Sequence, residues 1–368
     1  MRYIISGGGT GGHIYPALAI AKEIKYFDKN AEILYIGTKD SLESELVPKE
    51  GIEFKAIRVK GLPRKLNKNS FIALKELLIG LNQSQDIIRQ FKPDIVIGTG
   101  GYVCGPIVYK AAKNNIPTLI HEQNAFPGIT NKILSRYVDK VATTFDEAAK
   151  YFKFPDRVVN TGNPIRREIF NKDKELSYKV LNMESKKPLV LSFGGSGGQK
   201  KLNDAILDIL LNNKWSNDLQ LIHITGKRLF DSFMKEIKDS NIVLNKNIRI
   251  LPYLYEMPEA LNIADLLISS SGAITLAETS AIGLPSILIP KGYTAENHQE
   301  YNARAFEKSG ASIVILEKDL NGEVLVNTIN DLMNDKLKLK NMSINSKKLG
   351  NKDATKEIVK IISEIIAK

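Results

Sequence analysis

The chain has 368 residues, of which 43% are hydrophobic and 25% are charged, a composition typical of globular proteins and a length sufficient for two hydrophobic cores. A formal net charge of +11 predicts anionic partners, such as phosphorylated substrates, nucleic acid or an acidic membrane surface. The single cysteine, Cys104, excludes an internal disulfide and a multi-cysteine metal site and fits a reducing cytoplasm.

The first predicted strand, Tyr3–Ser6, is not preceded by a signal-peptide pattern and leads into the glycine loop GGGTGGH, which a helix over residues 14–27 follows. The loop contains GxGxxG, which by itself is a weak indication of a dinucleotide site. Such a site also needs an acidic residue at the end of the second strand, whereas the second strand here, EILYIG, ends at Gly37 and Thr38. NAD binding is therefore disfavoured, and we expect the loop to cradle a phosphate or pyrophosphate with its backbone.

Residues 59–91 are first basic and then amphipathic. Lys60, Arg64, Lys65 and Lys68 precede a predicted helix with more apolar residues than one core-facing stripe requires, namely Phe71, Ile72, Leu74, Leu77, Leu78 and Leu81. Two interpretations stay open: a thick core-facing helix beside a solvated basic loop, or a helix with some side chains facing lipid. Because no apolar run approaches the roughly 20 residues of a spanning helix, we expect any membrane association to be peripheral.

A second glycine loop and a row of polar side chains follow the next two predicted strands. The strand over residues 94–98 ends in GTGGYVCG, and the strand Thr118–His121 runs into HEQN, residues 121–124. Both lie at the carboxyl edge of one parallel sheet, where open α/β sheets bind ligands. We expect at least one HEQN side chain to face a ligand, and Cys104 to be a small buried filler.

The opening pattern repeats in the second half of the chain. A turn, TGNP, closes the first half, and the segment NKDKELSYKVLNMESKKP is predicted to be a polar helix and loop that serve as a linker. A strand over residues 189–193, the glycine loop GGSGG and a helix over residues 202–211 then follow.

This duplication predicts an α/β fold of two Rossmann-like domains that face one another across a cleft. We expect the N-terminal domain to span residues 1–163, with the helix of residues 353–368 packed back on it. The C-terminal domain is expected to span residues 164–352.

The stretch Asp265–Arg304 contains a strand, a small-residue turn, a helix and a second strand in βαβ order. A turn this small lets a ligand approach the first N–H groups of the helix, which favour an anion such as phosphate. Glu278 lies about one helical turn beyond the turn residues, where a diphosphate would repel it, so its expected partner is a ribose diol. Beyond the second strand, His298, Gln299 and Asn302 are expected to bond sugar hydroxyls, which predicts a nucleotide-sugar site.

Motifs along the whole chain resemble those of the MurG family of peptidoglycan N-acetylglucosaminyltransferases. They are, in the order found in that family, GGGTGGH, GTGGYVCGP, HEQNAFPG, GNPIR, GGS, SGAITLAE and HQEYNA. The resemblance implies a GT-B glycosyltransferase fold. It also implies transfer of N-acetylglucosamine from UDP-N-acetylglucosamine to the 4-hydroxyl of undecaprenyl-pyrophosphoryl-N-acetylmuramyl pentapeptide (lipid I), giving lipid II on the cytoplasmic face of the cell membrane.

The resemblance further implies a set of donor contacts. They are Thr10, Gly11, Gly12, Asn124, Arg166, Ser196, Leu254, Ala273, Ile274, Thr275, Leu276, Ala277, Glu278 and Gln299. Two residues depart from the family pattern: Gly197 stands where Gln or Arg is usual, so one polar contact to the donor is expected to be missing, and Cys104 stands where Ser is common. Because no DxD-type carboxylate pair lies near the nucleotide turn, we expect no metal or other cofactor, and helix N-termini and Arg166 should offset the diphosphate charge.

The expected reaction is a single, inverting displacement at the anomeric carbon, which needs one general base and a stabilised leaving group. His13 is the preferred candidate base because the positive end of a helix dipole favours its neutral, proton-accepting form. Glu122 is the alternative candidate. His13 would serve equally well as a donor to a phosphate oxygen.

Two other classes of protein remain as alternatives. A soluble NDP-sugar glycosyltransferase or a sugar 2-epimerase of the same architecture would keep the SGAITLAE site but would not need a lipid-facing patch. A nucleic-acid-binding protein would use the positive charge, but its Lys and Arg should cluster with aromatic residues on one face, and here they are scattered. We therefore expect UDP-N-acetylglucosamine, lipid I and an anionic membrane surface as partners, and no nucleic acid.

Overall fold

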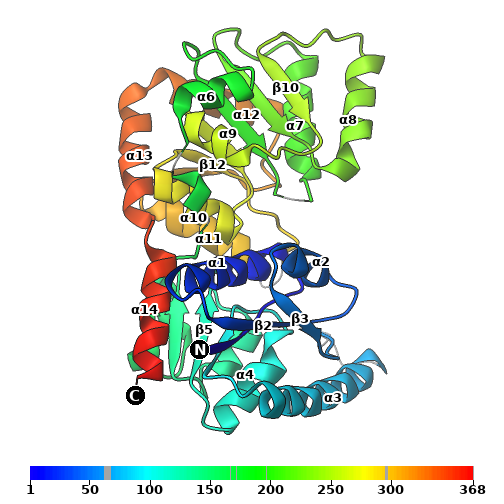
Figure 1. Cartoon of the computed structure of the whole chain (residues 1–368). Coiled ribbons are helices and arrows are strands. Elements are labelled where there is room, and N and C mark those ends of the chain that lie inside the picture. Colours follow the sequence, from blue (N-terminus) through cyan, green and yellow to red (C-terminus); the bar gives the residue numbers. More distant parts are fainter. Residues whose placement is uncertain (62–67, 166, 171, 196, 295–296, 368) are drawn as a thin grey trace. The chain divides into compact units, whose positions relative to one another are not determined.

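Runs of Ile, Leu and Val form two parallel β-sheets, one in each of two units of the chain (Figure 1). The structure, a computed structural model, describes residues 1–61, 68–165, 167–170, 172–195, 197–294 and 297–367. Unit 1 comprises Met1–Ile165 and Asn351–Lys368, and unit 2 comprises Arg166–Gly350. Every strand pair in both sheets is parallel, which confirms the predicted α/β class.

The sheet of unit 1 has the strand order β3-β2-β1-β4-β5-β6-β7. Its strands are β1 (Arg2–Ser6), β2 (Glu32–Gly37), β3 (Glu53–Ala56), β4 (Ile95–Gly98), β5 (Thr118–Glu122), β6 (Lys140–Thr143) and β7 (Val158–Asn160). The order reverses between β1 and β4, so the loops after these two strands start side by side at the carboxyl edge. Both are glycine loops, and this switch point is where open α/β sheets bind ligands.

Helices cover both faces of the sheet in unit 1 (Figure 1). They are α1 (Gly11–Phe27), α2 (Leu42–Lys49), α3 (Lys68–Phe91), α4 (Cys104–Lys113), α5 (Ile129–Leu134) and α14 (Ala354–Ile366), with 3-10 turns η1 (Asp146–Tyr151) and η2 (Pro155–Arg157). α1 and α14 pack against each other, and Ile358 and Ile362 of α14 join Ile5 and Ile14 in one hydrophobic core. α3 and α4 contribute to the core on the other face of the sheet.

The sheet of unit 2 has the strand order β10-β9-β8-β11-β12-β13. Its strands are β8 (Leu189–Phe193), β9 (Gln220–Ile224), β10 (Ile248–Leu251), β11 (Leu266–Ser269), β12 (Ser286–Leu288) and β13 (Ser312–Val314). The order reverses between β8 and β11, so the third glycine loop and the turn after β11 meet at one switch point.

The helices of unit 2 build two cores, one on each side of its sheet. They are η3 (Arg167–Ile169), α6 (Lys174–Val180), α7 (Lys200–Leu211), α8 (Lys227–Asp239), α9 (Met257–Ile263), α10 (Ala273–Ile282), α11 (His298–Lys308), α12 (Gly322–Asn334) and α13 (Lys336–Leu349). None of the helices in the described part of the chain is both long enough and apolar enough to cross a membrane.

Two local predictions are wrong. The polar segment predicted as a linker is part of unit 2, because α6 packs against α9 and Leu181 and Met183 are buried in a core. The helix predicted from residue 14 begins at Gly11, with Thr10 as its extended N-cap. Glycine tolerates both loop and helical backbone, so the apolar spacing could not locate this start.

Cys104 is fully buried in the core beneath the second glycine loop, which confirms its prediction as a filler. Burial raises the pKa of its thiol to about 12. The side chain therefore stays a protonated, unreactive thiol at neutral pH.

Candidate active site

In unit 1, His13 is held by the loop after β4 and by the end of β5. Its Nδ1 lies 3.0 Å from the carbonyl oxygen of Thr99 and 3.1 Å from Oε1 of Gln123. Gln123 donates from Nε2 to the carbonyl oxygen of Thr99 at 2.7 Å and to Nδ1 of His121 at 3.0 Å. Nε2 of His121 lies 3.0 Å from the carbonyl oxygen of Gly162. One continuous chain of hydrogen bonds therefore runs from Gly162 to His13.

The hydrogen-bonding partners of His121 and His13 determine which ring nitrogen of each histidine carries the proton. The carbonyl oxygen of Gly162 can only accept, so His121 carries its proton on Nε2 and accepts on Nδ1 from Gln123. Burial lowers the pKa of His121 to about 4, which keeps it neutral near pH 7. Both atoms that face Nδ1 of His13 are oxygen acceptors, so neutral His13 also carries its proton on Nδ1. Its Nε2 is then left as a proton acceptor.

The second glycine loop presses its backbone against the imidazole of His13. A Cβ at Gly100 would lie 2.7 Å from Nδ1 of His13, and a Cβ at Gly101 would lie 2.3 Å from the carbonyl oxygen of Gly8. Both glycines have a positive φ, of 101° and 78°, which glycine adopts without strain. Glycine is therefore required at both positions for His13 to lie between the two loops.

Glu122 is 1% exposed, and both of its carboxylate oxygens accept hydrogen bonds. Oε1 accepts from the backbone N–H of Asn124 at 3.0 Å and from its Nδ2 at 3.1 Å. Oε2 accepts from the backbone N–H of Gly128 at 3.1 Å and from Nδ2 of Asn131 at 2.8 Å. These four bonds fix the loop after β5 and fill the acceptor sites of the carboxylate, so a general base at this position would have to give up one of them to take up a proton. The geometry favours His13 over Glu122 for that role.

A buried carboxylate outside the predicted set, Glu43, anchors the first glycine loop. Its Oε2 accepts from the backbone N–H of Gly9 at 3.2 Å, and its Oε1 accepts from Oγ1 of Thr38 at 2.7 Å. Burial raises the pKa of Glu43, but the hydrogen bonds from Thr38 and from the backbone outweigh burial and hold the pKa below its ordinary value. The charged carboxylate occupies the backbone N–H of Gly9 and repels an anionic ligand from that position. Acidic residues are common at helix starts, so no sequence signal singled out Glu43.

In unit 2, the SSG turn (Ser270–Gly272) joins β11 to α10. Gly272 is the N-cap of α10 and has no side chain with which to bond the first N–H groups of the helix. Ser271 donates from Oγ to the carbonyl oxygen of Gln299 at 2.6 Å, and Asn302 donates from Nδ2 to the carbonyl oxygen of Ser271 at 3.3 Å. The start of α11 is thereby tied to the SSG turn. Glu278 lies on α10 and is 6% exposed.

A lysine outside the predicted set, Lys291, lies beside the third glycine loop. Its Nζ donates to the carbonyl oxygen of Gly198 at 2.8 Å, and its backbone N–H donates to Oε1 of Gln299 at 3.0 Å. A Cβ at Gly195 would lie 3.4 Å from Oγ of Ser270 and 3.9 Å from Nζ of Lys291. The third glycine loop, the SSG turn and Lys291 therefore converge at the switch point of unit 2.

The predicted site residues fall into two groups, one in each unit. Unit 1 holds Thr10, Gly11, Gly12, His13, Glu122 and Asn124, and unit 2 holds Leu254, Ala273–Glu278, His298 and Gln299. Arg166 and Ser196 lie outside the described residues. The side chain of Leu254 is buried in a core of unit 2, so only its backbone can face a ligand. The described ranges contain no group of three or more His, Cys, Asp or Glu that could hold a metal ion.

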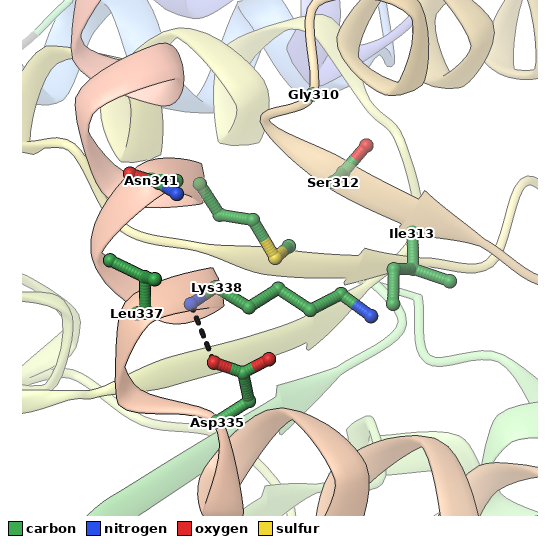
Figure 2. Close-up of a pocket in the computed structure, with 8 residues that line it drawn as sticks. Gly310, Ser312, Ile313, Asp335, Leu337, Lys338 and Asn341 are labelled. Carbon is green, nitrogen blue, oxygen red and sulfur yellow. Dashed lines mark hydrogen bonds between the residues drawn. The ribbon is translucent and has the colours of Figure 1, made fainter.

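A cavity of about 350 Å³ lies between β13 and the start of α13 in unit 2 (Figure 2). Figure 2 shows the Lys338 side chain extending toward Ile313, above Asp335. Asp335 caps α13 by accepting from the backbone N–H of Lys338 at 2.9 Å. None of the predicted site residues lines this cavity, which is therefore separate from the candidate site.

Comparison with known proteins covers almost the whole chain. Residues 3–143 match the glycosyltransferase family 28 N-terminal domain, and residues 189–358 match the glycosyltransferase family 28 C-terminal domain. A relative from Acetivibrio thermocellus is 50% identical over 366 residues, covering 100% of this chain and 98% of the relative. That relative is named UDP-N-acetylglucosamine--N-acetylmuramyl-(pentapeptide) pyrophosphoryl-undecaprenol N-acetylglucosamine transferase.

Solved structures show the same architecture. The crystal structure of MurG from Acinetobacter baumannii is 28% identical to this chain with a TM-score of 0.78, and 99% of each chain is covered. A UDP-GlcNAc 2-epimerase from Neisseria meningitidis bound to UDP-GlcNAc is 14% identical with a TM-score of 0.70, covering 99% of this chain and 100% of the epimerase. At that identity the epimerase shares the fold alone.

Proposed function

Because this chain belongs to glycosyltransferase family 28, we propose that it transfers N-acetylglucosamine from UDP-N-acetylglucosamine to the 4-hydroxyl of N-acetylmuramyl-(pentapeptide) pyrophosphoryl-undecaprenol, lipid I. The observation that carries the proposal is 50% identity, over the full length of the chain, to a relative that bears the name of this transferase. The product is lipid II, and the reaction is a step of peptidoglycan synthesis.

Unit 2 supplies the donor site in this proposal. The start of α10 directs N–H groups at the diphosphate, and Glu278 accepts from the ribose hydroxyls. The backbone at Leu254 bonds the uracil edge, while His298 and Gln299 bond the sugar. The hydrogen bonds between the SSG turn and α11 support this assignment. They hold the start of α10, proposed to face the phosphates, in a fixed position relative to the start of α11, proposed to face the sugar. Arg166 and Ser196 are further proposed donor contacts from the resemblance.

Unit 1 supplies the general base and further contacts to the substrates at Thr10, Gly11, Gly12 and Asn124. Nε2 of His13 accepts the proton of the acceptor hydroxyl as its oxygen bonds the anomeric carbon from the face opposite the diphosphate. The bond from the anomeric carbon to the β-phosphate oxygen breaks, UDP leaves with the electron pair, and the configuration inverts. The hydrogen-bond chain through Gln123 and His121 supports this role, because it holds the proton of His13 on Nδ1.

The sugar 2-epimerase alternative shares the architecture, so the test must separate the two reactions. We expect labelled N-acetylglucosamine to move from UDP to a lipid I analogue, with release of UDP only when the analogue is present. An epimerase would convert UDP-N-acetylglucosamine to its C2 epimer without any acceptor. Epimer formation, or no transfer to the analogue, would overturn the proposal.

The apolar face of α3 supports a further proposal, that the enzyme binds peripherally to an anionic membrane on its cytoplasmic side. Phe71 is 79% exposed, and Ile72, Leu74 and Leu78 are also exposed, whereas Ile87 and Ile88 of the same helix are buried in the core. These four side chains are the apolar residues beyond the core-facing stripe. A polyprenyl-linked acceptor stays in the bilayer, so its enzyme must work at the membrane surface.

Cations accompany this apolar face. Lys60 and Lys75 are exposed, whereas Arg58 is paired with Glu76 at 2.6 Å. Arg64 and Lys65 lie outside the described residues, as does the side chain of Lys68. Each cation near an anionic leaflet contributes on the order of 1 kcal/mol, and burial of apolar side chains adds about 25 cal/mol per Å², which together suffice for reversible binding.

We expect polar substitution of Phe71, Ile72, Leu74 and Leu78 by Ser or Gln to abolish sedimentation with anionic vesicles. Reversing the charge of Lys60, Arg64, Lys65 and Lys68 should do the same at low salt, because it replaces attraction to the leaflet with repulsion. Turnover of a short-chain, water-soluble acceptor should stay unchanged in both variants.

The matched control replaces Leu176 and Val180, which are exposed apolar residues of α6 in unit 2. This control should sediment like the parent protein. If both α3 variants still bind vesicles as well as the parent at low salt, the α3 face is ordinary surface.

A further inference from the structure

We propose that Lys291, in the loop after β12, binds the diphosphate of the nucleotide donor. It supplies a positive charge beside the third glycine loop, whose sequence GGSGG contains no cationic residue. The proposal rests on the donor site described above and adds to it a residue outside the implied contacts. In the described part of the GGSGG loop, Gly194, Gly195, Gly197 and Gly198 offer only backbone groups to a phosphate.

The side chain of Lys291 reaches the third glycine loop. Its Nζ is 2.8 Å from the carbonyl oxygen of Gly198 and 3.9 Å from the point that a Cβ on Gly195 would occupy. Oγ of Ser270, in the SSG turn, is 3.4 Å from that same point. The ammonium is therefore close to both the glycine loop and the turn that leads into α10. These are the two elements that meet at the switch point, where ligands of open α/β sheets bind.

The backbone of Lys291 is fixed to the same site. Its N–H donates to Oε1 of Gln299, and the carbonyl oxygen of Gln299 accepts from Oγ of Ser271. The lysine, the start of α11 and the SSG turn thus form one hydrogen-bonded cluster. Such anchoring reduces the conformational freedom that the side chain would lose when it binds an anion.

The charge of Lys291 is incompletely compensated within the described residues, where no ion pair within 4.0 Å involves it. The nearby carboxylate of Glu317 accepts instead from Nε2 of Gln199 at 2.9 Å and from the backbone N–H of Gly292 at 3.1 Å. An ammonium has three donors, and Gly198 takes one of them. A half-buried cation with open donors is stabilised when an anion binds beside it.

The pKa of Lys291 agrees with this environment. Burial lowers the pKa of the ammonium, and Glu317 only partly offsets that effect. A bound diphosphate would favour the charged form and raise the pKa again. Lysine binds phosphate as a compact point charge, so it does not need the bidentate geometry of an arginine.

We expect Lys291→Met to weaken UDP binding about 10- to 100-fold in calorimetry, the range for one charge-assisted hydrogen bond. Uridine lacks phosphates, so its affinity should change less than about twofold. Lys308→Met is the matched control, because Lys308 is an exposed lysine at the opposite end of α11 from Gln299. This control should bind UDP like the parent protein.

A second variant separates lost charge from lost structure. Among the described residues, apart from its neighbours in sequence, no atom lies within 4 Å of a Cβ at Gly197, so an arginine side chain can start there without a clash. Gly197→Arg added to Lys291→Met should restore at least part of the UDP affinity. Restoration, together with unchanged uridine binding, supports the proposal.

Three results would overturn the role of Lys291. The first is a Lys291→Met variant that binds UDP like the parent. The second is an equal loss of UDP and uridine affinity. The third is a lower melting temperature of Lys291→Met together with no recovery of UDP affinity when Gly197→Arg is added. Either of these two results would show that Lys291 only stabilises the structure of the loop. A parent protein that does not bind UDP would instead contradict the proposed function.

Discussion

Replacing His13 with alanine is expected to lower kcat about 100-fold or more while UDP affinity stays within about twofold. The variant loses the only imidazole nitrogen that the hydrogen-bond chain leaves open for the acceptor proton, because Nδ1 faces Thr99 and Gln123. Turnover with saturating lipid I analogue and calorimetry with UDP measure the two quantities separately. A loss in kcat with intact UDP binding identifies an interaction made in the transition state.

His13→Asn distinguishes proton transfer from phosphate binding. Asparagine can donate a hydrogen bond to a phosphate oxygen but cannot take up a proton near pH 7. If His13 is the base, the asparagine variant should be as slow as the alanine variant. Recovery of turnover in His13→Asn, or a fall in UDP affinity as the main effect of His13→Ala, would assign His13 to phosphate binding.

Replacing Glu278 with alanine is expected to weaken UDP binding by about 2 to 4 kcal/mol, roughly 30- to 1000-fold. The variant loses two charge-assisted hydrogen bonds to the ribose diol, and Glu278 is 6% exposed, so water cannot readily replace them. Calorimetry with UDP and with 2′-deoxy-UDP gives the measurement. The parent protein should discriminate between the two nucleotides, and Glu278→Ala should not.

Glu300→Ala is the control for this prediction. Glu300 lies on α11, beside Gln299 in sequence, and forms a surface ion pair with Arg304 at 3.9 Å. Its replacement should change UDP affinity by less than about threefold, because exposed pairs contribute little. Unchanged UDP affinity in Glu278→Ala would remove Glu278 from the donor site.

The centre of each sheet could be predicted from the sequence because the strands at the switch points, β1, β4, β8 and β11, are almost entirely buried. Tyr3–Ser6 and Leu189–Phe193 are short apolar runs that each lead into glycines, and in the structure they become β1 and β8, next to the switch points. Glycine runs and a run of polar residues after a strand are local signals. They located the glycine loops, the HEQN segment and the SSG turn without any knowledge of tertiary structure.

Other parts of the site depend on contacts between residues far apart in sequence. Lys291 meets Gly198 across 93 residues, Gln123 meets His13 across 110, and Glu43 meets Gly9 across 34. No local pattern encodes such pairs. The same limit explains the wrong linker prediction: the segment around α6 is polar in sequence, yet Leu181 and Met183 give it a place in a core.

The amphipathic helix α3 shows where a pattern leaves two interpretations open. Its apolar residues exceed one stripe, and spacing alone could not tell whether the excess side chains face a core or lipid. In the structure Phe71, Ile72, Leu74 and Leu78 are exposed. A purely core-facing helix is therefore excluded.

The packing of α14 against α1 constrains the order in which the protein matures on the ribosome. Ile358 and Ile362 complete the same core as Ile5 and Ile14, although all of unit 2 separates them in the chain. At roughly 5 to 20 residues per second, synthesis of residues 166–350 delays the arrival of α14 by about 10 to 40 seconds. Unit 1 is thus translated first but completed last. Until α14 arrives, the apolar side chains that it will cover on α1 and on the sheet of unit 1 remain accessible to chaperones.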